Sequence, residues 1–273
     1  MWALKLLLVP AAIYLLLVAL LFFMQTSMLF PARYVGPPAP LPPSAERLEL
    51  AVPPDLRLRG VHIAASAPSA ERTLILGFGG NAADAGTTAL LLHDLFPQAE
   101  IVSFYYRGYA PSGGRPGAAA FKEDAPHILD AMRARFSPGR TIAVGFSVGT
   151  GVAASLAARR PVDGLILVTP FDSLGRVAAG HYRWAPVRWL FRHPLEPARD
   201  LAGVRTPVAI VAAERDDVVV PARTAALRGA VPNLVYDRTI PGVGHNSIYD
   251  HPAFMGTMRE ALDRVASRPA PAS

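Results

Sequence analysis

The chain of 273 residues contains no cysteine, which excludes disulfide bonds and thiolate metal sites. None of its seven histidines forms a His-x-x-x-His or His-Glu-x-x-His pair, so the usual zinc-binding spacings are missing as well. Scattered histidines and carboxylates leave a cysteine-free zinc site open in principle. We expect neither a metal nor another cofactor.

The sequence also lacks any run of five or more basic residues, although Lys and Arg (27) outnumber Asp and Glu (21) and give a net charge of +6. Nucleic-acid binding normally combines such charge with a basic patch and a reading motif. Because neither is visible, we expect no nucleic-acid partner. The positive charge then either has no function beyond an arginine-rich composition or serves to contact anionic lipid headgroups.

No charged residue lies between Lys5 and Arg33, and residues 6–24 are mostly Leu, Val, Ala and Phe. A helix needs about 20 apolar residues to cross a bilayer. A cleaved signal peptide is the alternative, but its apolar core is only about 7–15 residues long and ends in a small-x-small site. Residues 25–29 offer no convincing site of that kind. We predict that residues 1–30 are an uncleaved, single-pass anchor in the bacterial inner membrane, with its orientation open.

Residues 31–56 are rich in proline and predict an extended spacer. From residue 57 to residue 268, short apolar runs alternate with helical patterns, which predicts one domain built on a mostly parallel sheet covered on both faces. Reactive groups then gather beyond the carboxyl ends of the strands. The predicted strands are 57–63, 73–77, 101–105, 141–146, 164–168, 207–212 and 234–239, and the predicted helices are 87–95, 118–135, 148–159, 222–229 and 253–266.

A candidate nucleophile lies in the segment Gly145-Phe146-Ser147-Val148-Gly149. A predicted strand precedes this Gly-x-Ser-x-Gly pattern and a helix of small residues follows it, which is the setting of a nucleophile elbow. The glycines relieve crowding at the sharp turn, and the start of the helix favours developing negative charge near Ser147. The alternative is a serine that only caps the helix.

A serine nucleophile needs a base, which we predict to be His245. His245 follows the 234–239 strand through a glycine-bearing turn and therefore lies at the carboxyl edge of the sheet. His251 is a weaker candidate.

The acid that orients the histidine is expected on the loop after strand 207–212, where Asp216 and Asp217 are adjacent. Counting forward from the strand favours Asp216, and counting back from the helix that begins near Pro221 favours Asp217. We prefer Asp216 and keep Asp217 as the alternative.

Acyl transfer also requires two donors for the oxyanion of the tetrahedral intermediate. We predict the backbone N–H of Val148, directly after the candidate nucleophile, and the N–H of Asn81. Asn81 lies in the glycine-rich loop 77–82 after a strand. The alternative interpretation of this loop is a flexible turn.

Together these segments resemble the membrane-anchored, single-domain α/β-hydrolases related to serine-aminopeptidase-like hydrolases. Residues 78–82 are similar to their Phe-His-Gly-Asn-Ala loop, with Gly79 in place of the histidine, and residues 106–109 match their Tyr-Arg-Gly-Tyr segment. Residues 145–149 and 244–246 match the elbow and the histidine turn. The resemblance implies an α/β-hydrolase fold with a short cap, preceded by one transmembrane helix.

The cap is expected at residues 171–201, where aromatic residues and arginines are interleaved. Such a segment suits an apolar acyl pocket or a bilayer surface, or packs on the domain itself. We expect a serine hydrolase that cleaves a small-molecule ester or thioester through an acyl-enzyme. The alternatives are aminopeptidase-like peptide hydrolysis and a catalytically silent, membrane-bound scaffold. No motif indicates an oligomeric state.

Overall fold

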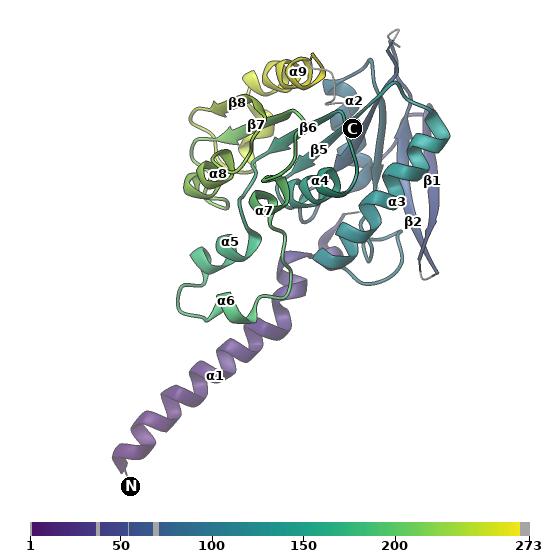
Figure 1. The fold of residues 1–273 in the computed structure, drawn as a ribbon. Coiled ribbons are helices and arrows are strands. Elements are labelled where there is room, and N and C mark those ends of the chain that lie inside the picture. The colour runs from purple at the N-terminus through teal and green to yellow at the C-terminus, as the bar shows by residue number, and fades with distance from the viewer. Residues whose placement is uncertain (1, 37–38, 54, 68–70, 268–273) are drawn as a thin grey trace.

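The computed structural model describes residues 2–36, 39–53, 55–67 and 71–267. Met1 of the expected anchor, three prolines of the expected spacer (Pro37, Pro38 and Pro54) and Arg268 at the end of the expected domain lie outside the described residues. One eight-stranded sheet runs through the molecule in the order β1-β2-β4-β3-β5-β6-β7-β8 (Figure 1). The strands are β1 (Ala45–Val52), β2 (Leu56–Ile63), β3 (Thr73–Phe78), β4 (Glu100–Phe104), β5 (Arg140–Phe146), β6 (Gly164–Val168), β7 (Val208–Ala213) and β8 (Leu234–Ile240).

In the order of the sheet, the strands β4, β3, β5, β6, β7 and β8 are parallel to one another. Strand β2 is antiparallel to both of its neighbours, β1 and β4. Parallel strands need crossover connections, which helices supply here. Helices α2 (Ala85–Leu95) and α9 (Ala253–Ala266) contact each other on one face, while α3 (Ala118–Phe136), α4 (Val148–Arg159) and α8 (Pro221–Arg228) lie on the other (Figure 1). This arrangement confirms the predicted, mostly parallel sheet with helices on both faces.

The central strands are apolar throughout because helices cover both of their faces. Every residue of β6 and β7 is buried. The carboxyl ends of these parallel strands point to one edge of the sheet, and the loops that leave that edge carry the predicted site residues.

The segment expected to be a spacer, residues 31–56, contains the edge strand β1 as well as irregular chain. Leu48 and Val52 are buried, and Leu50 between them is half-buried, so every second residue faces the core. This alternation is the period of a half-buried strand. The prolines before residue 44 dominate the composition of the segment and hide the strand pattern that follows them.

Helix α1 (Trp2–Leu29) projects away from the domain (Figure 1). Its residues Leu8–Leu29 have a mean hydropathy of 2.3 and are long and apolar enough to cross a membrane. Directly after the helix, the buried ring of Phe30 packs edge-to-face on Phe121 of α3, at 4.9 Å, and on His193, at 5.0 Å. The direction of α1 is therefore tied to the body of the domain. Burial lowers the pKa of His193 and the nearby charge of Arg192 lowers it further, and both effects favour the neutral ring.

Residues 171–201, where we expect the cap, contain three short helices between β6 and β7. Helices α5 (Leu174–His181) and α6 (Val187–Leu190) lie beside the C-terminal half of α1, away from the sheet (Figure 1). Helix α7 (Pro197–Leu201) returns to pack on α4. The segment thus reaches from the sheet to the apolar helix.

Two glycines inside helices allow a matched test of packing. A Cβ at Gly149 in α4 would lie 2.0 Å from the carbonyl oxygen of Phe78, whereas a Cβ at Gly256 in α9 would have no neighbour within 4 Å. We expect Gly149→Ala to lower the free energy of unfolding by about 3 kcal/mol or more, because a backbone carbonyl must move. We expect Gly256→Ala to raise it by about 0.5–1 kcal/mol through the helix preference of alanine.

Far-UV circular dichroism of the full chain in detergent, followed through chemical denaturation, measures both changes. Equal effects of the two substitutions would contradict the close approach of α4 to β3.

Candidate active site

Ser147 lies at the sharp turn between β5 and α4, with φ 49° and ψ −117°. Residues other than glycine rarely adopt these backbone angles, because the Cβ atom clashes with the neighbouring backbone. Such strain persists only where the surrounding structure imposes it. The N–H of Ser147 donates to the carbonyl of Val168 in β6, at 2.9 Å. A Cβ at Gly145 would lie 2.6 Å from the carbonyl oxygen of Gly149, so only glycine fits there. The flanking glycines thus permit the turn that presents Ser147 above the strand ends.

His245 lies on the loop after β8 and is buried with 6% of its surface exposed. Its Nε2 is 2.9 Å from the Oγ of Ser147, and its Nδ1 is 2.8 Å from Oδ2 of Asp216. With the ring proton on Nδ1 donated to the carboxylate, Nε2 is free to accept the proton of the serine hydroxyl. The structure thus brings together Ser147, His245 and Asp216 in one chain of hydrogen bonds.

Asp216 and Asp217 differ sharply in their surroundings. Asp216 has 5% of its surface exposed, and its Oδ1 accepts the backbone N–H groups of Val218 and Val219, at 3.0 and 2.7 Å. Asp217 is exposed. The loop turns back on the carboxylate of Asp216 and leaves its second oxygen for His245. The weaker histidine candidate, His251, instead accepts the N–H of Ala253 at the start of α9, at 3.2 Å.

The loops that carry Asp216 and His245 are joined by three hydrogen bonds. The N–H groups of Glu214 and Arg215 donate to the carbonyls of Ile240 and Val243, at 3.0 and 2.8 Å. The carboxylate of Glu214 accepts the N–H of Gly242, at 2.8 Å. Sequence reasoning missed Glu214, because a carboxylate next to a candidate acid carries no signal that it binds a loop 28 residues further along.

Gly80 and Asn81 line the same cavity as Ser147 and Val148. A Cβ at Gly80 would lie 3.7 Å from the Cβ of Ser147, so this loop passes directly beside the serine. The N–H of Ala83 donates to the carbonyl of Gly80, at 3.3 Å, and closes a turn around Asn81. Val148 is the first residue of α4, where N–H groups have no partner within the helix.

Two tyrosines of the Tyr106-Arg107-Gly108-Tyr109 segment hold the backbone of this loop. Tyr106 donates from Oη to the carbonyl of Gly79, at 2.9 Å, and Tyr109 donates to the carbonyl of Asn81. Burial raises the pKa of both phenols, which keeps them as neutral donors. Sequence resemblance singled out this segment without indicating what it does.

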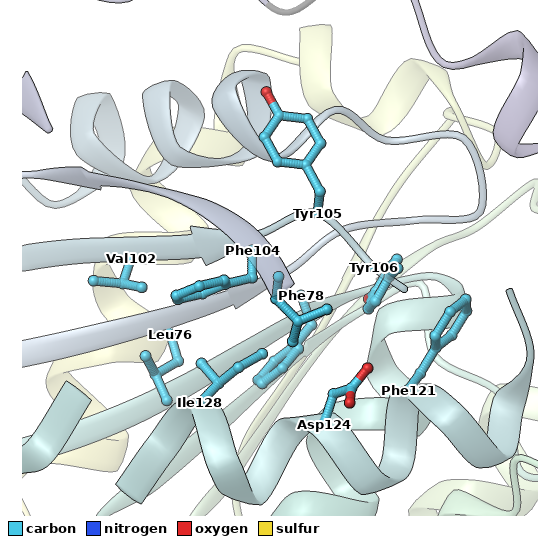
Figure 2. A pocket seen from close by; sticks show the side chains of 11 residues that line it. Leu76, Phe78, Val102, Phe104, Tyr105, Tyr106, Phe121, Asp124 and Ile128 are labelled. Atoms are coloured by element: carbon cyan, nitrogen blue, oxygen red, sulfur yellow. The ribbon is translucent and has the colours of Figure 1, made fainter. Parts of the chain in front are cut away.

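A small, mostly apolar cavity lies beside Tyr106, with walls from the sheet and from α3 (Figure 2). Figure 2 shows Tyr106 near Phe121, and the two rings stack with centroids 4.3 Å apart. Arg107 pairs with the buried carboxylate of Asp124 in α3. Burial raises the pKa of Asp124 by more than the contact with Arg107 lowers it. The tyrosine segment is therefore fixed to α3 on one side and to the loop of Asn81 on the other.

The cavity above Ser147 and His245 has a volume of about 1010 Å³. Its walls come from the strand-end loops, from α5 of the cap and from Met28 and Leu29 of α1. Burial raises the pKa of Tyr249, another lining residue, to about 12, and the carboxylate of Asp216 adds to this rise. Among the described residues, no three histidine or carboxylate side chains gather where they could hold a metal ion.

The chain is similar to known α/β hydrolases. The family of the alpha/beta hydrolase fold matches residues 74–205. An uncharacterized protein of Mycobacterium tuberculosis is 33% identical over 199 residues, which cover 70% of each chain. Lysophosphatidylserine lipase ABHD12 of Rattus norvegicus is 29% identical over 192 residues, which are 60% of this chain and 48% of the lipase, so the chain matches about half of that relative.

The fold also matches solved structures. A structure of an esterase from Pyrococcus furiosus superposes with a TM-score of 0.67 and 16% identity, covering 84% of this chain and 97% of the esterase. An α/β hydrolase from Vibrio vulnificus superposes with a TM-score of 0.62 and 19% identity, covering 82% of this chain and 81% of the other. At these identities the similarity shows a shared fold.

The different surroundings of Asp216 and Asp217 predict different effects when each is replaced by asparagine. We expect Asp216→Asn to lower kcat about 10⁴-fold, because the amide favours the wrong histidine tautomer. Asp217→Asn, at an exposed site, should change kcat by no more than about twofold. Hydrolysis of a chromogenic ester measures both, and a larger loss in Asp217→Asn would exchange the two assignments.

The hydroxyl of Tyr109 provides a test of the loop geometry. We expect Tyr109→Phe to lower kcat about tenfold with little change in KM, because the loop of Asn81 loses a donor that orients it. Tyr236→Phe is the matched control, since Tyr236 donates to Glu260 of α9, at 2.9 Å, and neither residue lines the cavity of Ser147. Equal kinetics of the two variants would remove Tyr109 from the positioning of the loop.

Proposed function

Because this chain belongs to the α/β-hydrolase family, we propose that it is a serine hydrolase that cleaves an ester or thioester of an apolar acyl group. The observation that carries this proposal is the hydrogen-bonded series from Ser147 through His245 to Asp216. The lipase and esterase among its relatives support the choice of an acyl substrate.

In the proposed reaction, Oγ of Ser147 attacks the acyl carbonyl carbon while Nε2 of His245 takes the hydroxyl proton. The N–H groups of Val148 and Asn81 stabilise the oxyanion. The tetrahedral intermediate then collapses, the bond to the leaving alcohol or thiol breaks, and His245 returns the proton to it.

Water completes the cycle by attacking the acyl-enzyme. His245 removes a proton from this water, and a second tetrahedral intermediate releases the carboxylic acid and the free serine. Asp216 holds the imidazole in the required tautomer and stabilises its charged form throughout. His245 releases each proton that it takes up, so the reaction as written needs no metal and no redox partner.

The lining of the cavity favours an ester over a peptide with a free amino group. A carboxylate is the strongest partner for the ammonium group of an aminopeptidase substrate. None of the described residues that line the cavity is Asp or Glu, and most of them are apolar. Aminopeptidase-like hydrolysis is therefore the weaker alternative.

Membrane attachment is part of the proposal. Residues Leu8–Leu29 of α1 have the length and hydropathy of a membrane span. The bacterial inner membrane remains our expectation for its location, with a small-molecule acyl ester as partner and no nucleic acid.

Labelling with a fluorophosphonate tests the nucleophile and separates an enzyme from a catalytically silent scaffold. We expect the full chain in detergent to be labelled, Ser147→Ala to be unlabelled, and His245→Ala to react at least about 10³-fold more slowly. The matched controls Ser66→Ala, at an exposed serine, and His251→Ala should be labelled like the unaltered chain.

A labelled Ser147→Ala protein would refute the assignment of the nucleophile. A folded, unaltered chain that neither reacts with the fluorophosphonate nor hydrolyses esters would support the scaffold instead.

A further inference from the structure

The cap and α1 are joined by hydrogen bonds between residues far apart in the sequence. Gln25 accepts the N–H of Arg192 at 2.8 Å and donates to the carbonyl of Leu190 at 3.2 Å, which satisfies its buried amide. Oγ1 of Thr26 and Nε2 of His193 lie 2.8 Å apart. These polar groups of a mostly apolar helix therefore fix the cap against it.

An apolar crevice of about 170 Å³ lies between the two elements. Its α1 wall is Val18, Leu21, Phe22, Gln25, Met28 and Leu29, and its cap wall is Ala178, Tyr182, Ala185, Val187, Leu190 and Phe191. Four of these residues, Met28, Leu29, Ala178 and Tyr182, also line the cavity that contains Ser147. One apolar wall therefore continues from the serine to the middle of α1.

The crevice lies beside the C-terminal half of the segment that could span a membrane. The 22 residues of Leu8–Leu29 extend about 33 Å at the rise of a helix, close to the thickness of about 30 Å of a hydrocarbon core. Tyr14 lies about 22 Å along the axis from Leu29, and its hydroxyl donates to the carbonyl of Trp184 in the cap at 3.2 Å. The cap thus packs alongside α1 rather than beyond its end.

The outer surface of the cap suits contact with the interface of a bilayer. Trp184 and Trp189 are 48% and 78% exposed, although tryptophan is normally buried in water-soluble domains. Tryptophan is enriched at the interface of a bilayer, and arginines near it reach the lipid headgroups. Arg183, Arg188 and Arg192 are exposed on the same segment.

We propose that the substrate is a membrane lipid ester with a long acyl chain, and that this chain lies in the crevice between α1 and the cap while its carbonyl is at Ser147. The ester reaches the cavity sideways from the bilayer, so its chain passes from lipid to crevice without crossing water. This inference rests on the proposed function and adds the binding site for the distal part of the chain.

The test uses the full chain reconstituted into phosphatidylcholine vesicles with two fluorogenic esters. 4-Methylumbelliferyl palmitate is dissolved in the bilayer, and 4-methylumbelliferyl acetate is supplied from water. The variant Ala185→Phe fills the crevice at a residue that lines it but does not line the cavity of Ser147. Ala179→Phe adds the same bulk to the cap at a residue that lines neither.

We expect Ala185→Phe to lower kcat/KM for the palmitate about tenfold or more while acetate hydrolysis stays within about twofold. Ala179→Phe should leave both rates unchanged. Leu21→Trp, which fills the crevice from the α1 side, should reproduce the selective loss. An unchanged rate of fluorophosphonate labelling in each variant shows that the fold is intact.

Palmitate hydrolysis that survives both crevice substitutions would overturn the inference, and so would an equal loss for palmitate and acetate. A chain that cleaves acetate but not palmitate would also overturn it while leaving the proposed function in place. Absence of both activities and of labelling would instead contradict the proposed function itself.

Discussion

The turn at Ser147 sets the distances on which the rest of the site depends. For the serine to stand above the strand ends, α4 must begin directly at the end of β5 and pass against the backbone of Phe78 and Gly79 in β3 and the following loop. Glycine at position 149 permits that approach. The same approach brings the loop of Asn81 beside Ser147, so the strained residue and the loop next to it share one packing constraint.

The opposite side of the site depends on hydrogen bonds rather than on close packing. Asp216 is buried, but the N–H groups of its own loop satisfy one of its oxygens and His245 satisfies the other. A buried carboxylate without such partners would be costly. The bonds of Glu214 and Arg215 to the histidine loop then keep the two partners at a fixed separation. A rigid turn on one side thus faces a polar network on the other.

Local patterns in the sequence were sufficient to predict most of this arrangement. The alternation of apolar runs and helices predicted the parallel sheet, and the glycines around Ser147 predicted the turn between β5 and α4. The choice between Asp216 and Asp217 could not follow from spacing, because it depends on how the loop folds back toward Val218 and Val219. The catalytic roles of the gathered residues remain predictions.

Other features were hidden for physical reasons of a different kind. Strand β1 follows a proline-rich stretch whose composition hides the alternation of Leu48, Leu50 and Val52, and it lies at the edge of the sheet. The contacts of Tyr106, Tyr109 and Glu214 join segments about 28 residues apart, and no local pattern encodes such partners. Contacts between α1 and the cap bridge more than 160 residues.

The packing of Phe30 has a consequence for how often the site meets its substrate. Because Phe30 joins α1 to the domain through Phe121 and His193, the domain cannot tumble freely on a flexible tether. With α1 in a bilayer, encounters with the proposed lipid ester become a two-dimensional search, governed by lateral diffusion and by the number of ester molecules per unit area. Dilution of the vesicles in water would then change turnover little, whereas dilution of the ester among other lipids would slow it in proportion.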